Sequence, residues 1–123
     1  MSSGRGQPNG QLAAAISNSV VKALARTTGR GPTMAKTTLG DNGVFVVVQD
    51  SLTVGERTLT SAGQGQVVLD LRRRWQAVMK VDVSREIEEL TGRKVVGFMS
   101  DSHIDPDLAV EVFVLDNAAD AGA

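Results

Sequence analysis

Three stretches of the sequence combine residue types that could bind an anion or a metal. In the first, TTGRGPTMA, Arg30 and Gly31 stand between Gly29 and Pro32. An arginine fork fits phosphate or carboxylate, and a glycine lets the backbone approach an anion closely. However, a helical pattern precedes this stretch and a strand pattern follows it, the reverse of a P-loop. A helix stop at Gly29 and Pro32 is therefore the competing interpretation.

The second stretch, SAGQGQVVLDLRRR, places Gly63 and Gly65 directly before a predicted helix. The free N–H groups and positive dipole end of a helix start favour anions. Arg72 and Arg73 are candidates to add positive charge. The consecutive residues Arg72, Arg73 and Arg74 spread around the helix axis, so they cannot all face the helix start, and some should be solvated or paired. The competing interpretation is a structural kink between two helices.

The third stretch, SDSHIDPD, alternates Asp101, His103, Asp105 and Asp107 around the only histidine. Alternate residues of an extended chain point the same way, which a hard cation could use. No glutamate stands at the spacing of a calcium loop, and one histidine without cysteine does not make a zinc site. We therefore predict no metal, no cofactor and no catalytic residues. An enzyme that uses His103 and Asp101 is a distant alternative.

Composition excludes several classes of function. Thirteen Lys and Arg residues balance fourteen Asp and Glu, and the chain has one Trp, three Phe and no Tyr. It therefore lacks the basic surplus and the stacking aromatics typical of nucleic-acid binders. No apolar run approaches the roughly 20 residues of a membrane span, and the N-terminus lacks the apolar region of a secretory signal. We expect a cytoplasmic protein.

The 123 residues fit one domain. Residues 1–10 and 117–123 are small and polar and are predicted to be disordered tails around a single domain over 11–116. One apolar stripe predicts a helix from about residue 11 to residue 28. Its members are Leu12, Ile16, Val20 and Leu24.

Two pairs of strand-like runs follow this helix. The segments 33–39 and 44–48 flank Gly-Asp-Asn-Gly, a strong hairpin signal. The first looks like an edge strand, and the second, continuously apolar, is predicted to be a central strand buried on both faces. The segments 94–101 and 108–115 predict a second antiparallel pair.

Between the two pairs, the sequence predicts a short helix and a long one. Thr53 and Glu56 have the spacing of a capping box, and the short helix should end near Gly63. The long helix should end at Gly92. Its predicted apolar stripe comprises Val68, Leu71, Trp75, Val78, Met79, Val83, Ile87 and Leu90. The order α-ββ-αα-ββ predicts an α+β fold with a four-stranded, mainly antiparallel sheet packed against helices.

Such a sheet leaves its second face uncovered. If the segments 44–48 and 94–99 are both inner strands, they present apolar side chains on that face. A homodimer that pairs this face, or exchanges an edge strand such as 33–39, would bury it. The alternative is that the N-terminal helix covers the second face.

A series of landmarks in chain order resembles the bacterial MpsC-like family, named after a Na⁺-translocating system that generates a membrane potential. The resemblance extends over about residues 11–115. The landmarks are Gly29 to Pro32; Leu52, Thr53, Glu56 and Leu59; Gly65, Val68 and Arg72 or Arg73; Ile87, Leu90, Thr91, Gly92 and Val95; Ser100 and Asp101; and Phe113 to Leu115.

This resemblance implies a soluble, non-enzymatic accessory or regulatory protein that acts with a membrane cation or bicarbonate transport partner. It brings no catalytic residues with it. The alternative is a small-molecule sensor that binds an anion or nucleotide at Arg30 and at the helix start of Gly63 and Gly65.

Overall fold

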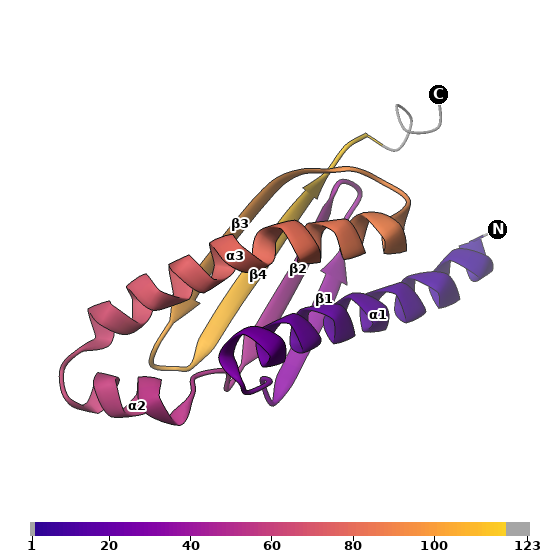
Figure 1. Cartoon of the computed structure of the whole chain (residues 1–123). Helices are drawn as coiled ribbons and strands as arrows, with labels where there is room; N and C mark the ends of the chain where they lie inside the picture. The colour runs from indigo at the N-terminus through magenta and orange to yellow at the C-terminus, as the bar shows by residue number, and fades with distance from the viewer. Residues whose placement is uncertain (1, 118–123) are drawn as a thin grey trace.

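Three helices and four strands follow one another in the predicted order, α-ββ-αα-ββ (Figure 1). The structure, a computed structural model, describes residues 2–117. The elements are α1 (Ser2–Thr28), β1 (Met34–Leu39), β2 (Gly43–Gln49), α2 (Val54–Ser61), α3 (Gly65–Thr91), β3 (Val95–His103) and β4 (Leu108–Leu115). The fold class predicted from sequence is confirmed.

The helix α1 begins earlier than its apolar stripe predicts. It starts at Ser2 rather than near Gln11, so residues 2–10 are helical where the sequence indicated a tail. These residues are polar and rich in glycine. A helix that lacks a repeat of apolar residues cannot be detected from apolar periodicity. Of the second predicted tail, 117–123, all but Asn117 lies outside the described residues.

The sheet has the strand order β1-β2-β4-β3, and all its neighbours are antiparallel. The predicted hairpin is present, and the N–H of Gly40 donates to the carbonyl of Gly43 at 2.8 Å. The edge position of β1 is confirmed. The prediction that residues 94–99 form an inner strand is wrong, because β4 pairs on both sides and leaves β3 at the other edge.

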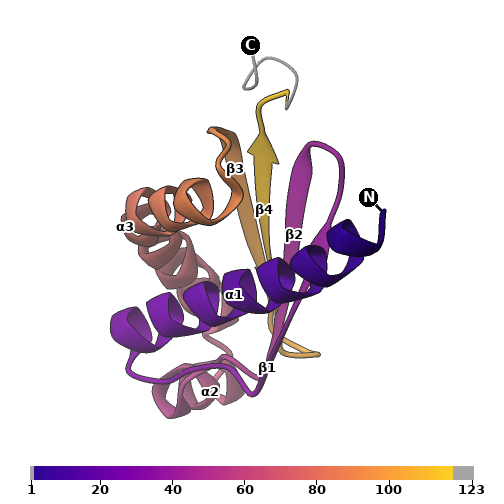
Figure 2. The same ribbon diagram turned by 90° about the vertical axis from the view of Figure 1, so that its right-hand side faces the viewer.

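Both long helices cover the same face of this sheet (Figure 2). The helix α1 packs on β1, α3 packs on β3, and the two helices contact each other. The alternative in which α1 covers the second face is therefore wrong. Between the two layers lies the core, which includes Ile16, Val20, Val44, Val46, Val48, Met79, Val83, Ile87 and Phe113.

Because all the helices of the described chain lie on one side, β2 is not buried on both faces as predicted. Its residues alternate between buried and exposed along the strand. Val46 is fully buried against the helices, whereas Phe45 is 51% exposed and Val47 is 36% exposed on the other face. The continuous apolar run therefore supplies a core on one side and an apolar surface on the other.

The predicted capping box and the predicted C-terminal ends of the helices are confirmed. The Thr53 hydroxyl accepts from the N–H of Glu56 at 3.2 Å, and the Glu56 carboxylate accepts from the N–H of Thr53 at 2.8 Å. Gly29 and Gly92 end α1 and α3 with φ values of 83° and 71°, in the left-handed region where glycine carries no Cβ penalty. Gly63, with φ of 79°, forms the kink between α2 and α3.

The buried side of α3 differs from the predicted stripe. It includes Arg72 and Gln76, whereas Val78 is 73% exposed and Leu90 is 40% exposed. Trp75 is half-buried, and the Arg72 guanidinium lies 5.5 Å from the centre of its ring. These two polar side chains can occupy core positions because they form hydrogen bonds there. Their partners lie in other segments of the chain.

Candidate functional site

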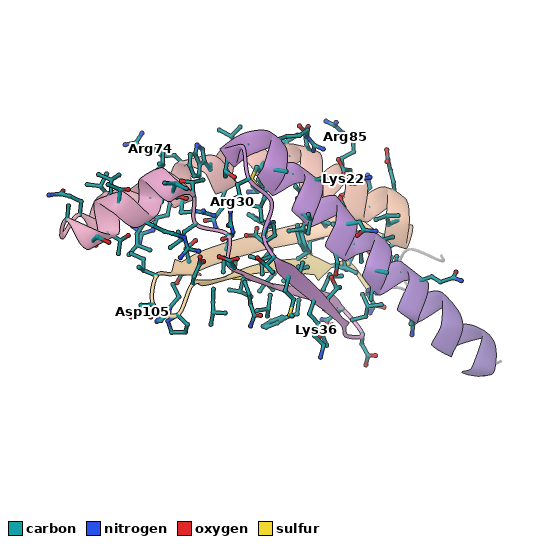
Figure 3. The ribbon with its side chains drawn as sticks, turned by 90° about the horizontal axis from the view of Figure 1, so that it is seen from below. Lys22, Arg30, Lys36, Arg74, Arg85 and Asp105 are labelled. Carbon is teal, nitrogen blue, oxygen red and sulfur yellow. The ribbon has the colours of Figure 1, made fainter. Side chains whose placement is uncertain are left out.

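The GRGP stretch holds the loop between β2 and α2. The Arg30 guanidinium donates to the Asp50 carboxylate at 3.0 Å, to the Asp50 carbonyl, and to the Leu52 carbonyl at 3.2 Å. The Thr28 hydroxyl donates to the Arg30 carbonyl at 2.8 Å, which fixes the backbone of the turn. Figure 3 shows Arg30 reaching inward from the turn after α1. Arg30 thus joins the end of α1 to residues 50–52.

Asp50 is the centre of this half-exposed cluster. It has a positive φ of 58°, and its carboxylate accepts from Thr33, Arg30 and Arg57. The Thr33 hydroxyl and the Arg30 guanidinium hold the pKa of Asp50 below its usual value. Arg57 also bonds the Asp107 carboxylate at 3.1 Å. The loop is therefore attached to α1, to α2 and to the turn before β4.

A buried ion pair lies beneath the same loop. Arg72 donates from Nε and Nη2 to the two carboxylate oxygens of Glu56 at 2.7 and 2.6 Å, and each side chain is only 2% exposed. Arg72 also donates to the Ser51 carbonyl at 2.7 Å. Burial raises the pKa of Glu56, but the bonds from Arg72 and from the Thr53 N–H outweigh it and leave that pKa lowered. The capping box of α2 is thereby attached to α3.

The candidate ligand residues are not gathered at one open anion site. The guanidinium groups of Arg30, Arg72 and Arg73 each face a carboxylate, which for Arg73 is Asp70 at 3.2 Å. Two of the three candidate glycines, Gly31 and Gly65, have neighbours that a side chain would contact, whereas Gly63 has none. A Cβ on Gly31 would contact Val21 Cγ1 at 3.5 Å, and a Cβ on Gly65 would lie 3.1 Å from Ile104 Cδ1. Ligand binding by Arg30, Gly31, Gly63, Gly65, Arg72 and Arg73 stays a prediction.

Sequence reasoning missed a second buried acid, Glu111 on β4. It is 2% exposed and faces the helices. The Ser100 hydroxyl donates to its carboxylate at 2.8 Å. Burial raises the pKa of Glu111 to about 7, against the opposing effects of this hydrogen bond and of the Arg72 charge. The alternation in LAVEVFVL was the available signal, because it places Glu111 in phase with the core residues Ala109 and Phe113.

The histidine turn forms local bonds. His103 Nδ1 lies 2.7 Å from the Pro106 carbonyl, and the N–H of Ser102 donates to Asp101 at 2.9 Å. In residues 2–117, no group of three His, Asp or Glu side chains could hold a metal ion.

The face of the sheet that points away from the helices is apolar at its centre. We call it the open face. The strand pairing places on it Met34, Lys36, Thr38, Phe45, Val47, Gln49, Met99, Asp101, His103, Leu108, Val110, Val112 and Val114. A shallow groove runs over its centre, with Phe45, Val47 and Val110 among its lining residues. Met99 and Met34 add apolar surface at the edges, with 57% and 55% of each residue exposed.

The fold defines a small α+β module with helices on one side of its sheet and an exposed apolar surface on the other. The family described as "Na+-translocating membrane potential-generating system (MpsC)" matches residues 8–117, and the chain belongs to this family. Comparison with curated proteins and with solved structures gave no match. Within the part of the chain that the structure describes, neither long helix is apolar enough to cross a bilayer.

Proposed function

We propose that this chain is a non-enzymatic accessory or regulatory protein of a membrane system that transports cations or bicarbonate or generates a membrane potential. It acts in the cytoplasm as a homodimer and contacts a membrane transport protein. The description of the MpsC family supports the link to a Na⁺-translocating system that generates a membrane potential. The observation that supports an associating rather than a catalytic role is the open face, where Phe45, Val47 and Met99 are all exposed.

The competing function is a sensor of an anion or nucleotide at Arg30 and the start of α3. Arg30 donates to Asp50 and to the Leu52 carbonyl, so an anion there would have to displace a carboxylate. A thermal-shift series with bicarbonate, phosphate and nucleotides separates the two functions, because a ligand that binds the folded state raises the melting temperature. The accessory role predicts no shift, and a saturable shift that Arg30→Leu abolishes would favour the sensor.

The proposed function itself is tested in the native cell. We expect that deleting the chain lowers the membrane potential measured with a potential-sensitive dye in Na⁺ medium. The intact chain should restore the potential, and so should the control Arg73→Leu, whose side chain is 63% exposed on α3. Val47→Asp, which places a charge on the open face, should not restore it. A deletion strain with an unchanged potential would contradict the proposed function.

A further inference from the structure

The open face is self-complementary in charge, and we infer that a second copy of the chain covers it with a twofold axis parallel to the strands. The inference rests on the proposed function in one respect, because it specifies how the two copies in the proposed homodimer are arranged. The axis runs between β2 and β4, and the two sheets form a sandwich with the helices on its outer sides.

One row of residues across the sheet carries the inference. The strand register aligns Lys36 with Val47, Val47 with Val110, and Val110 with Asp101. All four side chains lie on the open face, and the row reads cation, apolar, apolar, anion from one edge of the sheet to the other. A twofold rotation about the strand direction reverses this row onto itself. It therefore places Lys36 opposite Asp101 of the second copy, and Asp101 opposite the second copy's Lys36.

The two charges are available for such a contact. Lys36 and Asp101 are both exposed, and among the described residues neither forms a salt bridge. Figure 3 shows Lys36 pointing away from the helices, on the side opposite Lys22 of α1. Packed sheets lie about 10 Å apart. A lysine on one sheet and an aspartate facing it on the other can bridge this gap.

The next row supplies the apolar contact. The register aligns Thr38 with Phe45, Phe45 with Val112, and Val112 with Met99. The same rotation packs Phe45 on Val112 of the second copy and Val47 on its Val110. Aligned sheets cross at about 30°, which displaces the edge strands by about 4 Å, still within reach of a lysine. In these two rows the inner positions are thus apolar and the charges lie at the rim, as in stable protein interfaces.

The charges also exclude the other face-to-face arrangement. A twofold axis perpendicular to the strands and passing through the charged row would place Lys36 on Lys36 and Asp101 on Asp101. Like charges at two rims repel each other. An axis along the strands pairs opposite charges at both rims.

Charge reversal tests this arrangement directly. In sedimentation equilibrium, Lys36→Glu alone and Asp101→Lys alone should each raise the dimer dissociation constant about tenfold or more, because each change creates two repulsive contacts. An equimolar mixture of the two variants should form a heterodimer as tight as the unaltered homodimer, because both rims are again paired. High salt should reduce the defect of each single variant.

Matched controls on the helix layer are Lys22→Glu and Glu89→Lys, which make the same charge changes at exposed positions. Neither should change the dissociation constant, and circular dichroism confirms that every variant is folded. A monomeric unaltered chain, or single variants that dimerise like it, would overturn the inference. So would a mixture that associates no better than its components. The comparison of the deletion strain with the strain that carries the intact chain, which tests the link to the membrane potential, does not depend on any of these results.

Discussion

Arg72 and Arg73 follow one another on α3 but occupy opposite environments. Arg72 is fully buried and bonded to Glu56 and Ser51, whereas Arg73 is 63% exposed and meets Asp70 three residues earlier. The sequence placed arginines on this helix but could not say which one turns inward. The partners of Arg72 lie on the loop before α2 and on α2 itself, so local periodicity carries no information about them.

This contrast predicts different effects of the same substitution. Arg72→Leu should lower the free energy of unfolding by about 3–5 kcal/mol, because it leaves the Glu56 carboxylate buried without its cation. Arg73→Leu, the matched control, should change it by less than about 1 kcal/mol, since exposed ion pairs contribute little. Urea denaturation measures both values. Equal losses in the two variants would contradict the buried pair.

Glu111 predicts a pH dependence of opposite sign to ordinary acid denaturation. Its folded pKa of about 7 lies above the usual 4.5, so the folded state keeps a proton that the unfolded state loses in this range. The free energy of unfolding should therefore fall as the pH rises from about 4.5 to about 7, by at most about 3 kcal/mol. Asp50 and Glu56, whose pKa values are lowered, act in the more acidic range instead.

The variant Glu111→Gln keeps the shape of the side chain and removes its titration. We expect this variant to lose the decline between pH 5 and pH 7 and to exceed the unaltered chain in stability at pH 8. Urea denaturation across this pH series tests it. The prediction fails if the two proteins show parallel stability curves.

At the scale of elements, helix ends were predictable because they depend on short-range contacts. The bonds between Thr53 and Glu56 and the left-handed glycine at Gly92 need only neighbours in the chain. The start of α1 was not predictable, because residues 2–10 lack an apolar stripe. The two polar positions on the buried side of α3 were not predictable either, because their hydrogen-bond partners lie in distant segments.

The capping box of α2 carries its own prediction. Thr53→Ala removes the hydroxyl that accepts from the Glu56 N–H and should lower the free energy of unfolding by about 0.5–2 kcal/mol. Thr58→Ala is the control, since the Thr58 hydroxyl only donates to the Val54 carbonyl within α2 and should matter little. Thermal denaturation compares the two variants. Identical melting curves for Thr53→Ala and the unaltered chain would contradict the capping role.

At the scale of the whole molecule, the number of strands and their antiparallel pairing were predictable, but their order was not. Which strand lies inside depends on β2 pairing with β4, a contact between segments separated by about half the chain. The continuous apolar runs predicted a sheet that is covered on both faces, whereas the helices of the described chain cover only one face. The open face, with the rows that cross it, is therefore the feature from which we derive the proposed association.

Sedimentation equilibrium of the unaltered chain and of Val47→Asp, at micromolar concentration, tests this central claim most directly. Val47 lies on the open face and is partly exposed, so an aspartate there should leave the fold intact while it opposes burial of that face. We predict twice the chain mass of 12.9 kDa for the unaltered protein and a folded monomer for Val47→Asp. A mass of 12.9 kDa for the unaltered protein, or an undiminished dimer of the variant, would contradict the account.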